Sequence, residues 1–213
     1  MPTTQEILDH LQAASREARW LAAAWHAIVG GLFIAGVLGW RPDRSRVGRA
    51  LAIPLLSSSG TAWIFGNPFN GLILFALAAA LWVLGGRLPE GRAALSRSWV
   101  LLAGLGLVGF ACGYPAFLDD RGVVDHLLHA PMGVIPCPTL ALVLGVCLLF
   151  EGCVRREGLI LLALAGTFYG CFGWWSLGVA VDSVLAAGSI LVLIRSIMLG
   201  QGMTTAADGP ASV

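Results

Sequence analysis

Long apolar stretches separated by short polar linkers occupy most of this 213-residue chain. A helix of about 20 apolar residues spans the ~30 Å hydrocarbon core of a bilayer. Only 12% of the residues are charged, whereas about 25% are charged in a typical soluble domain. Backbone groups in lipid need hydrogen-bond partners within the chain, so the expected fold is an all-α, polytopic transmembrane helix bundle of about seven spans. The expected spans are 20–40, 49–66, 69–86, 99–118, 133–152, 158–175 and 178–199.

The boundary between the last two spans leaves an alternative open. Only the sequence WSLG separates them, so they require a tight hairpin, which Gly173 and Gly178 permit. A six-span bundle, with a partly re-entrant segment at this position, is the alternative.

The two ends of the chain differ from this apolar region. Residues 1–19 are expected to form an amphipathic helix at the membrane interface, because Ile7, Leu8 and Leu11 recur at helical spacing. The bundle itself is expected over residues 20–199. Residues 200–213 are small and polar, which is typical of a disordered tail.

The placement of arginine predicts the orientation of the bundle. All 13 basic residues are arginines, and with seven spans ten of them fall on one side of the membrane and three on the other. The positive-inside rule then places the N-terminus outside and the C-terminus in the cytoplasm. The lack of lysine excludes Schiff-base chemistry on lysine, and a net charge of +1 gives no reason to expect a nucleic-acid partner. The expected partner is the lipid bilayer.

Glycine is abundant, and two pairs have the spacing that lets helices approach closely. Gly109 and Gly113 form one pair, and Gly166 and Gly170 form the other. Packing inside the bundle is one use of such faces. Contact with a second copy of the chain, or with a partner in a membrane complex, is the other.

The linker before the fifth span carries histidines that favour metal binding or proton transfer. His126 and His129 are three residues apart and would share a helix face beside Asp125. Imidazoles in this arrangement, with the Cys137 thiol nearby in the chain, are candidate ligands of a transition metal. The alternative is an acidic linker whose histidines face water.

Cys137 lies between two prolines at the start of the fifth span. Proline suits the first position of a helix, so Pro138 at that position would make Cys137 the N-cap residue. A helix N-terminus favours negative charge and therefore a reactive thiolate. Alternatively, Pro136 and Pro138 only fix the backbone, and the cysteine fills a small space.

Asp182 is an ionisable residue within the last span. Such residues are costly in a bilayer and often mark functional sites. Asp182 also lies near the end of its span, where its carboxylate would reach the headgroups or accept a hydrogen bond from Ser183.

The phrase GVIPCPTLALVLGVCLLF resembles the signature of an uncharacterised family of small bacterial multi-span membrane proteins, which is known only as a domain of unknown function. The stretches GTFYGCFGWWSLGVAVDSVLAAG, NPFNGLILFALAAALWVL and EILDHLQAASREARWLAAAWHAIVG are similar to other parts of the same family. The resemblance implies a protein of the bacterial inner (cytoplasmic) membrane. The residues that it singles out are Pro136, Cys137, Pro138, Thr139, Asp182 and His126.

Three functions remain open at this stage. The first is a small transporter or permease-like protein for an ion or small solute, and the second is a membrane-embedded metal-binding or thiol redox protein that uses Cys137 with His126 or His129. The third is a structural subunit or assembly factor of a membrane complex. The chain has no nucleotide-binding loop and no known catalytic signature, so whether it is an enzyme stays open.

Overall fold

The computed structural model describes residues 3–96, 99–115 and 128–207, and the part it describes is mostly helical. The predicted all-α class is confirmed. A single pair of antiparallel strands joins β1 (Ala94–Leu95) to β2 (Phe150–Glu151) within the described residues. The helices are α1 (Thr4–Glu17), α2 (Arg19–Val37), α3 (Arg44–Ala50), α4 (Ala52–Ile64), α5 (Pro68–Gly85), α6 (Trp99–Cys112), α8 (Pro136–Leu149), α9 (Arg156–Cys171), the π-helical turn η1 (Phe172–Ser176) and α10 (Asp182–Ala207).

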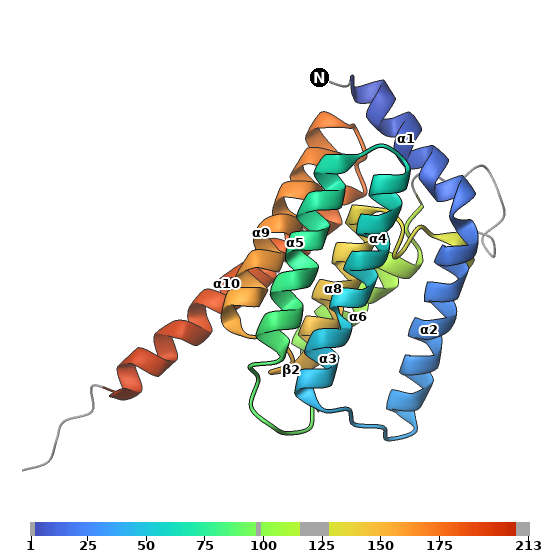
Figure 1. Ribbon diagram of the computed structural model, residues 1–213. Helices are drawn as coiled ribbons and strands as arrows, with labels where there is room; N and C mark the ends of the chain where they lie inside the picture. The colour runs from blue at the N-terminus through green and yellow to red at the C-terminus, as the bar shows by residue number, and fades with distance from the viewer. Residues whose placement is uncertain (1–2, 97–98, 116–127, 208–213) are drawn as a thin grey trace, which may run out of the picture.

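The helices form a bundle in which α8 is central (Figure 1). It packs against α4, α6, α9 and α10, and 11 of its 14 residues are buried. Figure 1 shows the N-terminus at one end of the bundle and β2 at the other. We call these the N-terminal end and the arginine end.

Three described helices are long and apolar enough to cross a membrane: α2, α5 and the continuous segment Arg156–Ser176. α6 and α8 are apolar but have only 14 residues each. The predicted second span is divided at Leu51 into α3 and α4. Every predicted span therefore contains helical residues. Helix length alone does not give the number of helices that cross the membrane.

The segment predicted as an interfacial helix is α1. Its first turn has a capping box, in which the backbone N–H of Glu6 donates to the Thr3 hydroxyl and the backbone N–H of Thr3 donates to the Glu6 carboxylate. These hydrogen bonds hold the pKa of Glu6 below its ordinary value. At the other terminus, α10 continues to Ala207, and the disordered tail expected over 200–213 stays a prediction.

Glycine lets α9 and α10 pack in direct contact. A Cβ atom at Gly170 would lie 2.5 Å from the backbone nitrogen of Ala186, and one at Gly166 would overlap the hydroxyl of Ser189. By contrast, a Cβ at Gly109 would have no neighbour within 4 Å among the described residues outside its own helix. The pair Gly166 and Gly170 therefore serves packing within the bundle, whereas Gly109 does not contact another described helix.

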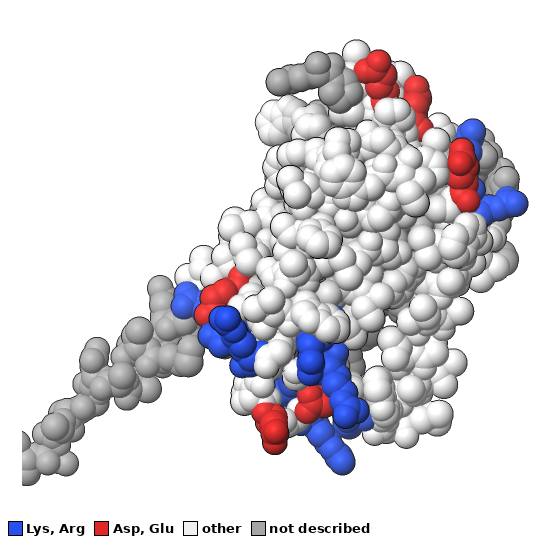
Figure 2. Space-filling model, viewed as in Figure 1, with Lys and Arg blue, Asp and Glu red and all other residues white. Residues whose placement is uncertain are grey.

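Charged residues gather at the two ends of the molecule, and the surface between them is apolar (Figure 2). Arginine dominates the arginine end, and acidic residues are prominent at the N-terminal end. Many large apolar side chains between the two ends are exposed, including Leu32, Phe33, Phe75 and Leu102.

Candidate functional site

The sequence Pro136-Cys137-Pro138 lies at the start of α8, but the helix begins two residues earlier than predicted. Ile135 is the N-cap residue, Pro136 takes the first helical position and Cys137 the second. The prediction that Cys137 is the N-cap was therefore wrong. A residue before proline prefers an extended backbone, and Ile135 has φ −115° and ψ 159°, so the first of the two prolines starts the helix.

The backbone before α8 is non-helical and buried. Residues 130–136 are all buried, and side chains from other helices satisfy their polar groups. Ser57 donates to the Gly133 carbonyl at 2.7 Å and accepts from the Trp25 indole at 3.0 Å. Thr139 accepts from the Gly133 N–H at 2.9 Å and donates to the Ile135 carbonyl at 2.6 Å. Thr139 thus has a structural role in the turn that positions Cys137.

Asp182 brings the site together. It is the first residue of α10 and is only 2% exposed. One carboxylate oxygen, Oδ1, accepts from the Tyr114 hydroxyl at 2.7 Å, and the other, Oδ2, accepts from the Cys137 thiol at 3.3 Å. The structure therefore joins two residues that were singled out separately, Cys137 and Asp182. We call Tyr114, Cys137 and Asp182 the carboxylate cluster.

Gly173 completes the surroundings of the carboxylate. It lies in the π-helical turn η1, and a Cβ atom at this position would overlap Asp182 Oδ2. Any side chain here would displace the carboxylate. Gly173 was considered in the sequence only as a hinge of the hairpin, so its role at the site was missed.

Tyr114 was also missed. It is fully buried beyond the end of α6, where its ring packs edge-on against Phe110. The signal in the sequence was weak but real: the chain has only two tyrosines, and a hydroxyl beside an apolar stretch needs a partner when it is buried.

The electrostatics of the cluster are unusual for a buried carboxylate. The two hydrogen-bond donors to the carboxylate within the described residues, a phenol and a thiol, are neutral. An uncompensated buried charge is expensive, and two hydrogen bonds offset only part of that cost. The N-termini of α8 and α10 both lie at the cluster, where helix dipoles favour negative charge. The carboxylate therefore lies buried between two helix N-termini, which favour its anionic form.

Of the three predicted metal ligands, His129 and Cys137 lie within the described residues. His126 lies outside them, and His129 is half-buried. No group of three or more His, Cys, Asp or Glu side chains that would hold a metal occurs within residues 3–96, 99–115 and 128–207. Pro138, which the sequence also singled out, is buried in the first turn of α8.

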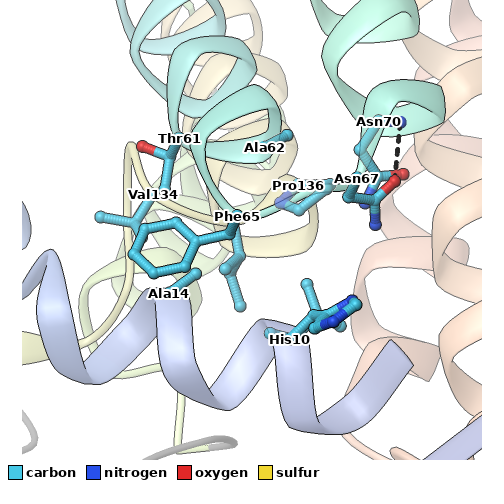
Figure 3. A pocket seen from close by; sticks show the side chains of 11 residues that line it. His10, Ala14, Thr61, Ala62, Phe65, Asn67, Asn70, Val134 and Pro136 are labelled. Atoms are coloured by element: carbon cyan, nitrogen blue, oxygen red, sulfur yellow. Dashed lines mark hydrogen bonds between the residues drawn. The ribbon is translucent and has the colours of Figure 1, made fainter. Parts of the chain in front are cut away.

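A small pocket of about 270 Å³ lies at the N-terminal end, between α1 and the ends of α4, α5 and α8. Figure 3 shows His10 of α1 on one side of it and Pro136 and the asparagines on the other. Asn67 caps α5 by accepting from the Asn70 N–H at 3.1 Å, and Asn70 accepts from the Tyr169 hydroxyl at 3.0 Å. Because Pro136 directly precedes Cys137, the pocket reaches the start of the helix that carries the thiol.

These features define the chain as a helical protein with apolar helices that are able to cross a membrane and with a buried carboxylate cluster near one end. Searches of protein-family models, curated proteins and solved structures found no match.

The cluster predicts unequal effects for its two donors. Tyr114→Phe should lower the free energy of unfolding by about 1–3 kcal/mol, because it leaves a buried carboxylate oxygen without its shorter hydrogen bond. Cys137→Ala should cost less through hydrogen bonding, because a thiol is a weak donor. Denaturation of the purified protein in detergent measures both effects, with Ser183→Ala at an exposed position as the control. Equal stability of Tyr114→Phe and the wild type would contradict the described hydrogen bond.

Proposed function

We propose that the chain is a seven-span integral protein of the bacterial inner membrane, with its N-terminus outside and its C-terminus in the cytoplasm. The apolar band between charged ends supports this placement (Figure 2), as does the concentration of arginine at one end. Tryptophans near the helix ends add an interfacial signal. The exposed ones are Trp20, Trp40, Trp63, Trp82, Trp99, Trp174 and Trp175. We also propose membership of the Pro-Cys-Pro-Thr family.

This topology predicts opposite labelling of the two ends. In a cysteine-free chain, a cysteine at Thr4 should react with a membrane-impermeant maleimide on intact spheroplasts. A cysteine at Glu90, in the link between α5 and β1, should react only after permeabilisation. Labelling of both positions on intact cells, or of Glu90→Cys alone, would contradict the proposed orientation.

For a protein with this membrane placement, the function that we propose is transport of a proton or another small cation, with Asp182 as the binding group. The observation that carries the proposal is the burial of Asp182, whose hydrogen-bond donors within the described residues are neutral. An ionisable group placed in this way inside a membrane protein is a candidate for a transport site. Buried non-helical backbone over 130–135 adds support, because membrane proteins keep such segments where they form binding sites.

Reconstitution tests the proposal. The full chain in lipid vesicles with a trapped pH-sensitive dye should carry protons faster than protein-free vesicles when a potassium diffusion potential drives them inward. A panel of monovalent and divalent cations, each with a matching indicator dye, tests whether the protein transports a cation other than the proton. Rates equal to those of protein-free vesicles for every ion would reject the proposal.

The contact between Cys137 and Asp182 favours a second candidate, a membrane-embedded thiol protein. The thiol donates a hydrogen bond to a carboxylate oxygen at 3.3 Å, which fixes its orientation, and the thiol must lose this proton to become the nucleophilic thiolate. Cys137→Ser separates the two candidates. Under the transport proposal this variant keeps most of the flux, because serine also donates to Asp182. Under the thiol proposal, Cys137→Ser no longer reacts with maleimide at position 137 and loses all activity that depends on the thiol.

A further inference from the structure

At the arginine end, backbone hydrogen bonds join three segments of the chain into a small layer, which we call the cap of the arginine end. The link between α2 and α3 pairs with the segment after α5, since Ala93 N–H donates to the Pro42 carbonyl at 2.8 Å and Arg44 N–H donates to the Gly91 carbonyl at 2.9 Å. The pairing of β1 with β2 adds the third segment. These backbone hydrogen bonds hold the arginines of the cap on a fixed frame.

The guanidinium of Arg44 lies at the centre of this cap. Its Nε donates to the Arg92 carbonyl at 3.2 Å, and a Cβ at Gly152 would lie 3.5 Å from it. The two terminal nitrogens of Arg44 have no hydrogen-bond partner among the described residues. The side chains of Arg46, Arg87 and Arg92 are exposed and likewise lack a partner within the described part of the chain.

The charges at this end are unevenly divided. On the side of α9 and α10, Arg155 pairs with Glu157, and Arg195 pairs with Glu151. On the side of α3, the acidic residues are few, and one of them, Asp43, is used to cap α3 through the N–H groups of Ser45 and Arg46. We call the side of α3 the open arginine face, which consists of Arg41, Arg44, Arg46, Arg49, Arg87 and Arg92.

We propose that the open arginine face binds the phosphate of anionic lipid headgroups, with Arg44 and Arg92 at its centre. Arginine presents several donors in a planar fork, which matches the oxygen atoms of a phosphate. The proposal rests on placement in a membrane and does not depend on transport.

The neighbours of the face favour a lipid over a soluble anion or a protein. Trp40 and Trp82 border it, and both side chains are at least half exposed. The guanidinium of Arg49 lies 5.9 Å from the ring centroid of Trp82, within the range of a cation–π contact. Tryptophan rings prefer the depth of the headgroups, so they place the arginines where anionic headgroups lie.

The test measures lipid binding to the full chain. Delipidated protein in detergent is titrated with phosphatidylglycerol or with zwitterionic phosphatidylcholine, and the bound lipids are counted by native mass spectrometry. We expect phosphatidylglycerol to bind more tightly. The double variant R44Q/R92Q should weaken that binding about 25-fold, because each arginine near an anionic surface contributes roughly a factor of five. The matched variant R155Q/R195Q removes the same charge from the same end, but from arginines that are already paired, and should change binding less than about twofold.

Three results would overturn the proposal: equal binding of the two lipids, equal weakening by the two double variants, or tighter binding of an acidic soluble peptide such as polyglutamate. If R44Q/R92Q does not fold, the single variant R46Q replaces it, because the Arg46 side chain is exposed and has no hydrogen-bond partner among the described residues. R46Q should weaken phosphatidylglycerol binding about fivefold, and unchanged binding would likewise overturn the proposal.

Discussion

Replacing Asp182 by asparagine is expected to reduce cation flux through reconstituted vesicles at least about tenfold, to the level of protein-free vesicles. Asparagine has nearly the same shape, so the packing against Gly173 is retained. It has no charge at any working pH, however, and its amide group donates hydrogen bonds where the carboxylate accepts them. The site would therefore keep its form and lose the group that binds a proton or cation.

A surface carboxylate provides the matched control for this variant. Glu157→Gln makes the same chemical change at an exposed position, where the carboxylate pairs with Arg155. Exposed ion pairs contribute little, so flux and stability should stay near those of the wild type. Flux through Asp182→Asn that equals the wild-type value would exclude Asp182 as the transport group.

Replacing Gly170 by leucine is expected to have the largest effect on stability. The Cβ would lie 2.5 Å from the Ala186 backbone nitrogen, and backbone does not move aside as a flexible side chain does. Overpacking typically costs 1–3 kcal/mol or more. At about 2–4 °C of Tm per kcal/mol for a chain of this size, the melting temperature should fall by roughly 2–12 °C.

Gly109→Leu is the control for this prediction. The position is also helical, but no atom lies within 4 Å of its Cβ, and leucine has the higher helix propensity. Thermal unfolding in the same detergent should show a melting temperature that is unchanged or higher. An equal decrease for the two variants would show that α9 and α10 are not packed as described.

The helical class was predictable because it follows from composition and from the cost of unpaired backbone groups in lipid. Helix ends were less predictable. Pro136 and Pro138 both suit a helix start, and the sequence does not decide between them. α6 ends at Cys112, earlier than the predicted span end at residue 118, although the apolar character of the sequence continues beyond that point.

The candidate site was half predictable. Cys137 and Asp182 attract attention individually, because a cysteine between prolines and an acid in an apolar span are both rare. Their contact joins residues 45 positions apart, which depends on how α8 and α10 pack. Tyr114 was missed because its partner is also distant, at a separation of 68 positions. Tertiary packing decides which residues this far apart in the sequence come into contact, and local sequence patterns do not predict it.

Infrared difference spectroscopy of the reconstituted protein measures the protonation of Asp182 most directly. If Asp182 binds the transported proton, the C=O band of its protonated carboxyl group should appear and disappear over the same pH range in which flux changes. That band should be absent in Asp182→Asn and retained in Glu157→Gln. Two results would contradict Asp182 as the transport group. One is a band that persists in Asp182→Asn, and the other is an Asp182 carboxyl group that does not titrate in the pH range where flux changes.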